Sequence, residues 1–125
     1  MTVTARTHPL LTYTLPGHAV DALTKHLAMK GKAIVEDMDL HEDRRLAMMV
    51  GVLFACGLRW NEIRGSIGVT TYSVSQLTDW FIGLWQSSGA FRHDYDRAML
   101  VLKHEAQEWI AAREIKIKYK GGDGN

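Results

Sequence analysis

Histidine and carboxylate residues are the side chains of this sequence most able to do chemistry, because they can bind metals or transfer protons. His104 and Glu108 are four residues apart, a spacing that can place two ligands on one face of a helix. Two further pairs of a histidine and a carboxylate are adjacent, at residues 41–42 and 93–94. None of these pairs matches a zinc signature such as His-Glu-x-x-His, so we interpret the histidines as surface residues. The sequence predicts no metal site and no cofactor.

Cys56 is the only cysteine, so no internal disulfide can form, and the chain fits a reducing compartment. It stands among apolar residues, which is typical of a small core residue rather than of a nucleophile. The glycines are scattered and form no phosphate-binding loop, and the sequence contains no nucleophile elbow. We therefore expect that the protein is not an enzyme.

Length and composition are typical of one globular domain. The 125 residues are 46% hydrophobic and 23% charged, with a net charge of +1, which excludes a wholly disordered chain. The first 11 residues lack the apolar segment of a signal peptide. No apolar run reaches the ~18 residues that a membrane span requires. We expect a cytoplasmic protein with a flexible N-terminus over residues 1–9, a single helical domain over 10–120 and a disordered tail over 121–125.

Charge is unevenly distributed along the chain. Residues 36–43 hold five acids and no Lys or Arg, whereas residues 113–120 hold four basic residues against one acid. One interpretation is that both segments are simply solvated. The alternative is a basic arm that binds phosphates, together with an acidic patch that faces away from nucleic acid or contacts a partner.

Apolar residues at spacings of three and four predict helices over 18–30, 40–56, 71–86 and 94–114. Gly31 is a natural end for the first of these helices, and the alternative is that residues 32–39 add a helical turn or two. The second is apolar on most sides after Arg45, which indicates a buried central helix. The apolar stripe of the helix over 71–86 consists of Val74, Leu77, Phe81, Leu84 and Trp85.

The two ends of the chain show an alternation of period two. Residues 11–15 alternate apolar side chains with threonine, and residues 115–120 alternate apolar side chains with lysine. The two segments could pair within one chain or between subunits. Alternatively, residues 115–120 are the end of the last helix followed by a basic tail. The predicted fold is mainly α, with about five helices and a two-stranded β ribbon formed by the chain ends.

Residues 56–85 have the pattern of a short helix, a tight turn and a longer helix. Gly68 stands where the first helix must end, since a residue without Cβ adopts positive φ at little cost. Thr70 or Thr71 can cap the next helix through its side-chain oxygen. The residues that two crossed helices would bury against each other are Ile63, Ile67, Val69, Val74 and Leu77.

This pattern, over residues 58–86, resembles the helix-turn-helix of DNA-binding regulators, in which the second helix enters the major groove. The helix over 40–56 would take the place of the supporting helix in sigma-factor region-four-like folds. The resemblance implies that Arg59 and Arg64 contact the flanking DNA backbone. It also implies base or phosphate contacts from Thr70, Thr71, Tyr72, Ser75, Gln76 and Asp79 on the second helix, and phosphate contacts from Lys116, Lys118 and Lys120.

The second motif helix carries no Lys or Arg and the motif has few positive charges, so a DNA-binding version should act as a homodimer on two half-sites. The expected function is a small sequence-specific transcriptional regulator of bacterial, phage or plasmid type. The alternative is a non-enzymatic inhibitor or adaptor that docks a protein partner through the acidic stretch and exposed aromatic residues such as Trp60.

Overall fold

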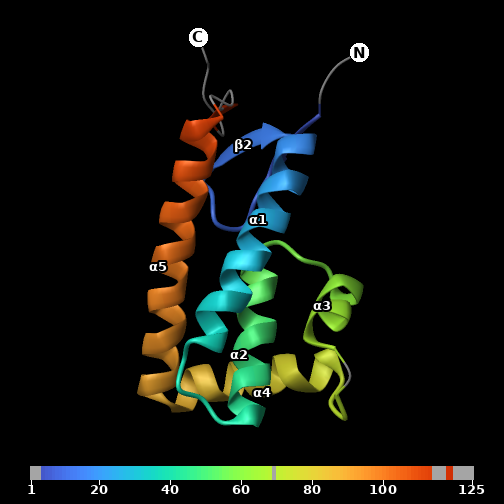
Figure 1. The fold of residues 1–125 in the computed structure, drawn as a ribbon, viewed down its shortest axis with the longest axis vertical. Coiled ribbons are helices and arrows are strands. Elements are labelled where there is room, and N and C mark those ends of the chain that lie inside the picture. Colours follow the sequence, from blue (N-terminus) through green and yellow to red (C-terminus); the bar gives the residue numbers. More distant parts are fainter. Residues whose placement is uncertain (1–3, 69, 114–117, 120–125) are drawn as a thin grey trace.

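The fold consists of five helices and a small sheet at one end (Figure 1). The computed structural model describes residues 4–68, 70–113 and 118–119 of the chain. The five helices and the small sheet agree with the predicted mainly α fold. In chain order, the elements are β1 (Ala5–Thr7), β2 (Tyr13–Pro16), α1 (Gly17–Glu36), α2 (Glu42–Ala55), α3 (Trp60–Ile67), α4 (Val74–Ser87), α5 (Gly89–Ala112) and β3 (Lys118–Tyr119).

Helices α1, α2 and α5 run along the long axis of the molecule, and α4 crosses the end that is remote from the sheet (Figure 1). Helix α2 packs against each of the other four helices. All eight residues from Leu46 to Leu53 are buried. This confirms the prediction of a buried central helix, because a helix surrounded on all sides needs apolar residues on all sides.

The chain ends pair as the alternation predicted. Strand β2 pairs with β3 in antiparallel orientation, with Tyr13 opposite Tyr119 and Thr14 opposite Lys118. A third strand, β1, joins the other edge of β2 and lies within the segment that we expected to be flexible. An ion pair of 2.9 Å between Arg6 and Asp21 of α1 helps to hold it there.

Helix α1 continues past Gly31 to Glu36, so the end at Gly31 is wrong and the alternative of further helical turns over 32–39 holds. The glycine instead allows α1 and α2 to approach closely. A Cβ at Gly31 would lie 2.9 Å from Val52 and 3.1 Å from the Cys56 sulfur. Because this close approach depends on the partner helix, it leaves no mark in the local sequence of α1.

Helix α5 begins at Gly89, five residues before the predicted start, and only Ser88 separates it from α4. The Ser88 hydroxyl caps α5 by accepting a hydrogen bond of 3.2 Å from the Phe91 backbone N–H. Phe91 is buried, and its ring makes an edge contact with Phe81 of α4 at a centroid distance of 5.7 Å. The serine cap and this aromatic contact fix the sharp corner between α4 and α5.

Candidate nucleic-acid interface

The start of α4 is fixed by a reciprocal pair of hydrogen bonds. The Ser73 hydroxyl accepts from the Gln76 backbone N–H at 3.0 Å, and the Gln76 side-chain oxygen accepts from the Ser73 N–H at 2.9 Å. This capping box satisfies two backbone donors that would otherwise lack partners. The predicted caps, Thr70 and Thr71, are therefore wrong, and α4 begins at Val74 rather than at residue 71.

The connection between α3 and α4 runs from Gly68 to Ser73, longer than the tight turn that we expected. Gly68 has a φ of 77°, as predicted for the residue that ends the first helix. Beyond it, the Thr70 hydroxyl accepts a hydrogen bond of 3.2 Å from the Tyr72 N–H. Thr70, Thr71 and Tyr72 consequently lie in this connection and not on α4.

The inner face of α4 packs across α2. Val74, Leu77 and Leu84 are buried, as the predicted stripe requires. At the crossing, the Phe81 ring sits directly on Gly51 of α2, where a Cβ would lie less than 3.0 Å from three ring carbons. Gly51 thus determines how closely α4 approaches the central helix.

Of the two tryptophans on α4, Trp85 differs from the prediction. Trp85 belongs to the predicted buried stripe but is exposed, and the Arg92 guanidinium lies 5.3 Å from its ring centroid. Trp80, outside that stripe, is half-buried and makes an edge contact of 5.7 Å with Tyr72. Tyr72 belongs to the connection before α4, so the aromatic residue that contacts Trp80 does not lie on a helix.

The outward face of α4 is open to solvent along its length. Ser75, Gln76 and Asp79 are exposed on its first half, and Ile82 and Gly83 continue the same face. A Cβ added at Gly83 would meet no atom within 4 Å, which shows how open this surface is. Three of the predicted base-reading side chains are therefore together on one accessible helical surface.

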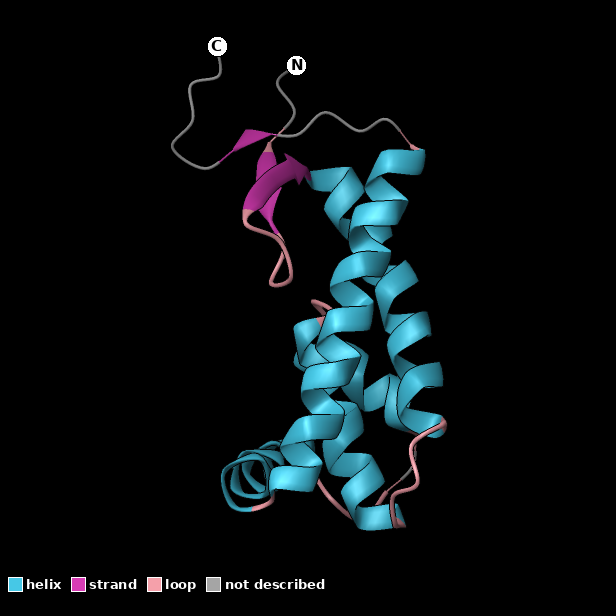
Figure 2. Cartoon of the chain, turned by 90° about the vertical axis from the view of Figure 1, so that its left-hand side faces the viewer, coloured by secondary structure: helices cyan, strands magenta, loops and turns pink. Residues whose placement is uncertain are grey.

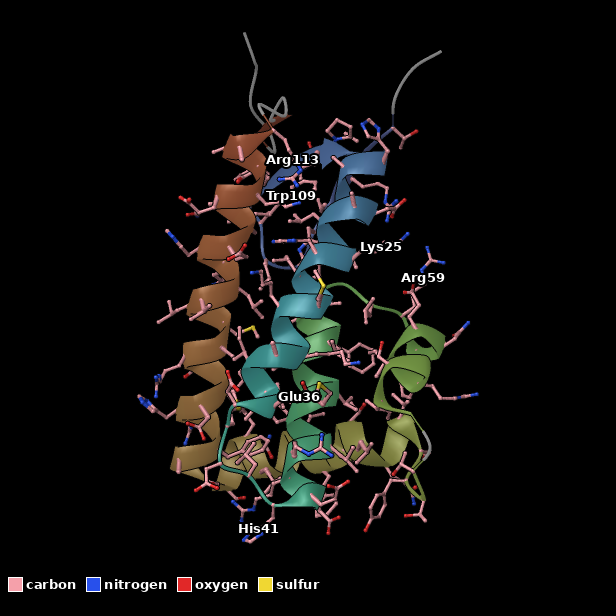
Figure 3. All side chains as sticks on the ribbon, in the orientation of Figure 1. Lys25, Glu36, His41, Arg59, Trp109 and Arg113 are labelled. Atoms are coloured by element: carbon pink, nitrogen blue, oxygen red, sulfur yellow. The ribbon has the colours of Figure 1, made fainter. Side chains whose placement is uncertain are left out.

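Helix α3 places one of the two predicted arginines, Arg64, beside the start of α4, whereas Arg59 lies at the other end of α3 (Figure 3). Arg59 precedes α3, its backbone N–H donates to Glu62 at 2.8 Å, and its side chain projects away from the ribbon (Figure 3). Arg64 is exposed and borders a groove of about 540 Å³ between α3 and the start of α4, together with Ile67, Tyr72 and Ser73. Arg64 can therefore reach a ligand that contacts the N-terminus of α4.

The predicted basic arm lies elsewhere. Lys116 and Lys120 are outside the described residues, while Lys118 belongs to β3, at the end of the molecule opposite α4 (Figure 2). Arg113, the first residue of the basic segment, lies over the Trp109 ring at 4.3 Å near the same end (Figure 3). The structure thus does not bring Lys118 together with α4 in one subunit.

Cys56, which follows α2, is in contact with His8, which lies between β1 and β2. Burial raises the pKa of the Cys56 thiol to about 12, and the thiol donates to the Leu27 carbonyl at 3.3 Å. His8 is buried, so the interpretation of the histidines as surface residues is wrong for this one. Its Nδ1 accepts from the Leu10 N–H at 3.1 Å, and its Nε2 contacts the Cys56 carbonyl at 2.6 Å. Since a carbonyl only accepts, Nε2 carries the proton, and the desolvated ring has a lowered pKa.

The remaining candidates for chemistry lie on the surface. His104 and Glu108 are both exposed, and their charged atoms are 4.0 Å apart. Glu105 accepts a hydrogen bond of 2.9 Å from His26 of α1, and this bond is the main cause of its lowered pKa. Among the residues that the structure describes, no group of three or more His, Cys, Asp or Glu side chains could hold a metal ion.

Comparisons with protein-family models, with curated proteins and with solved structures gave no significant match to this chain. Within the described ranges, no helix is both long enough and apolar enough to cross a membrane.

Proposed function

We propose that this chain is a small sequence-specific DNA-binding regulator in which α3 and α4 act as a helix-turn-helix and α4 enters the major groove. The observation that carries the proposal is the open outward face of α4. Ser75, Gln76 and Asp79 project from its N-terminal half, while its inner face is anchored on α2. A major groove about 12 Å wide admits one helix presented in this way.

The capping box limits what Gln76 can read. Its side-chain oxygen already accepts from the Ser73 N–H, which uses one of its two lone pairs, whereas both amide N–H donors remain for a ligand. Bidentate pairing with adenine requires an oxygen acceptor as well as a donor. We therefore expect Gln76 to donate to the acceptors of guanine, O6 and N7. Asp79, one turn further along, can accept from the N4 group of cytosine.

Phosphate contacts come from few groups. Helix α4 carries no Lys or Arg, so Arg64 and the N-terminus of α4 are the main phosphate-binding groups of this surface, and Arg59 would contact the DNA backbone further away, from the other end of α3. The affinity of one subunit is correspondingly modest, and two subunits on paired half-sites would supply the remainder. Such a homodimer would regulate a promoter by occlusion or recruitment, without catalysis.

The test is selection of bound duplexes from a randomised library, followed by fluorescence anisotropy of the enriched and scrambled duplexes at two salt concentrations. Gln76→Glu is the informative variant, because glutamate preserves the capping box but removes both donors and adds a negative charge. Gln107→Glu, on the exposed face of α5, is the control with the same change of charge.

We expect one enriched sequence, binding that weakens steeply with salt, and loss of specific binding only in Gln76→Glu. Light scattering should show a dimer on the enriched duplex. Failure to enrich any sequence, or equal affinities of Gln76→Glu and Gln107→Glu for the enriched duplex, would show that α4 does not read DNA.

A further inference from the structure

A groove separates the lower half of α5 from the segment that joins α1 to α2 (Figure 1). Its volume is about 610 Å³. Ile34, Met38 and Ala98 line it with apolar surface, and Leu100 and Val101 stand on its α5 side. Leu100 is 68% exposed and Val101 53% exposed, although both are large apolar residues. Two adjacent side chains of this kind beside a groove are a candidate contact surface.

The polar lining of this groove is mainly acidic. Asp37, Asp39 and Asp94 line it, and Arg97 is the basic residue among the lining side chains. None of the three aspartates forms an ion pair with another described residue. Residues 36–43, the most acidic stretch of the sequence, pass along the same edge. Figure 3 labels Glu36, the last residue of α1, and His41, the residue before α2, at the two ends of the segment that joins these helices.

We propose that this groove binds a short basic amphipathic helix of a protein partner. The apolar side of that helix covers Leu100 and Val101, and its Lys or Arg residues pair with the three aspartates. Helix-in-groove recognition uses this combination of an apolar floor and charged edges. The negative edge disfavours DNA at this site, because phosphates would be repelled, and the site is independent of the DNA-binding surface proposed for α4.

The charges and the exposed apolar residues have separate roles in this recognition. Attraction between the aspartates and a basic helix accelerates association and makes affinity dependent on salt. Burial of Leu100 and Val101 supplies the part of the affinity that salt does not remove. A ligand that satisfies only one of these requirements should bind more weakly than a ligand that satisfies both.

The probe is a fluorescein-labelled peptide of Leu and Lys, about four helical turns long, with leucines at spacings of three and four. Its controls are a scrambled peptide of the same composition and a Leu–Glu peptide with the same spacing. Binding to the full-length protein is measured by anisotropy at two salt concentrations.

Two protein variants and one control complete the experiment. Leu100→Ser removes the most exposed apolar contact, and Asp37→Asn with Asp39→Asn and Asp94→Asn removes the charges. Met29→Ser is a matched control, because Met29 is 64% exposed but lies on α1 outside the groove lining. Circular dichroism and thermal unfolding confirm that each variant is folded.

We expect the Leu–Lys peptide to bind, with about tenfold loss of affinity in Leu100→Ser and none in Met29→Ser. The triple Asn variant should lose both affinity and salt dependence. Equal binding of the scrambled peptide, equal affinity of Leu100→Ser and wild type, or no binding would overturn the proposal. If Leu100→Ser instead dissociates a dimer of the free protein, the groove is an interface between two copies and the proposal is wrong.

Peptide binding by Gln76→Glu separates this inference from the DNA-binding proposal. That substitution lies on α4, outside the groove lining, so it should leave the affinity for the Leu–Lys peptide unchanged. If the protein binds the peptide but no DNA, the groove proposal is supported and the DNA-binding proposal is wrong. If it binds the enriched DNA but not the peptide, the DNA-binding proposal is supported and the groove proposal is wrong.

Discussion

Substitution of Gly51 by alanine tests whether the contact between α2 and α4 determines the position of α4. In a helix interior, glycine to alanine is normally stabilising by about 1 kcal/mol. At Gly51, however, the new methyl group would lie less than 3.0 Å from three carbons of the Phe81 ring, so the ring must move. The ring also contacts Phe91 and Tyr95, at centroid distances of 5.7 and 5.0 Å, and cannot move freely. Overpacking of this kind costs about 1–3 kcal/mol.

The assay is urea unfolding followed by circular dichroism, with Gly83→Ala as the control. Gly83 is also helical, but its added Cβ would meet nothing within 4 Å, so this variant should be stabilised by about 0.5–1 kcal/mol. We expect Gly51→Ala to be less stable than Gly83→Ala by about 1–3 kcal/mol. In a Phe81→Leu background, the penalty of Gly51→Ala should shrink by about 1 kcal/mol or more, because the clash is relieved. Equal stabilisation by the two alanines would refute this account of the α2–α4 crossing.

Three further predictions concern stability and reactivity. Burial lowers the pKa of His8 below its ordinary 6.5, so the unfolded chain takes up a proton at higher pH than the folded one. As the pH falls from about 7.5 to 5.5, the free energy of unfolding of the wild type, measured with urea, should decrease relative to that of His8→Gln by up to about 1.4 kcal/mol per pH unit. Parallel pH profiles of the two proteins would contradict this. Ser73→Ala should lower the free energy of unfolding by about 1 kcal/mol and Ser73→Asp should not, as thermal unfolding can check. The Cys56 thiol should react with a disulfide reagent only in denaturant, and rapid modification of the native protein would disprove its burial.

The features that sequence predicted correctly are those that depend on local pattern. The central helix α2 is apolar on all sides, Gly68 stands where a helix must end, and both chain ends alternate with period two. The first two patterns have one main structural explanation each, and the mainly α architecture followed from such patterns. The alternation over 115–120 also allowed a helix end with a basic tail, and the structure decides for pairing of β2 with β3.

The features that sequence missed depend on contacts between distant segments. Gly31 reads as a helix end, but the approach of α2 makes it an interior packing residue. The cap of α4 is an exception, because Ser73 and Gln76 are only three residues apart and their Ser-x-x-Gln pattern is local; the prediction chose Thr70 or Thr71 instead. The sequence did not predict the groove beside Leu100, because its two walls are about 60 residues apart in the sequence. The lining residues of one wall fall within 34–39, and those of the other wall fall within 94–101.

The aromatic cluster of Phe81, Phe91 and Tyr95 joins the two proposed surfaces. Phe81 belongs to α4, whereas Phe91 and Tyr95 belong to the first turns of α5, next to the groove residue Asp94. The cluster therefore holds both α4 and one wall of the groove. Loss of its contacts should disturb both surfaces, while a change on either surface should leave the other intact.

This arrangement predicts a distinctive pattern for three variants. Gln76→Glu should weaken only DNA binding, and Leu100→Ser should weaken only peptide binding, because both side chains are exposed and neither belongs to the cluster. Phe81→Leu should weaken both, since it removes the edge contacts that orient α4 against α5. Anisotropy with the enriched duplex and, separately, with the Leu–Lys peptide measures all three. If folded Phe81→Leu loses only one of the two affinities, the aromatic cluster does not hold the two surfaces together.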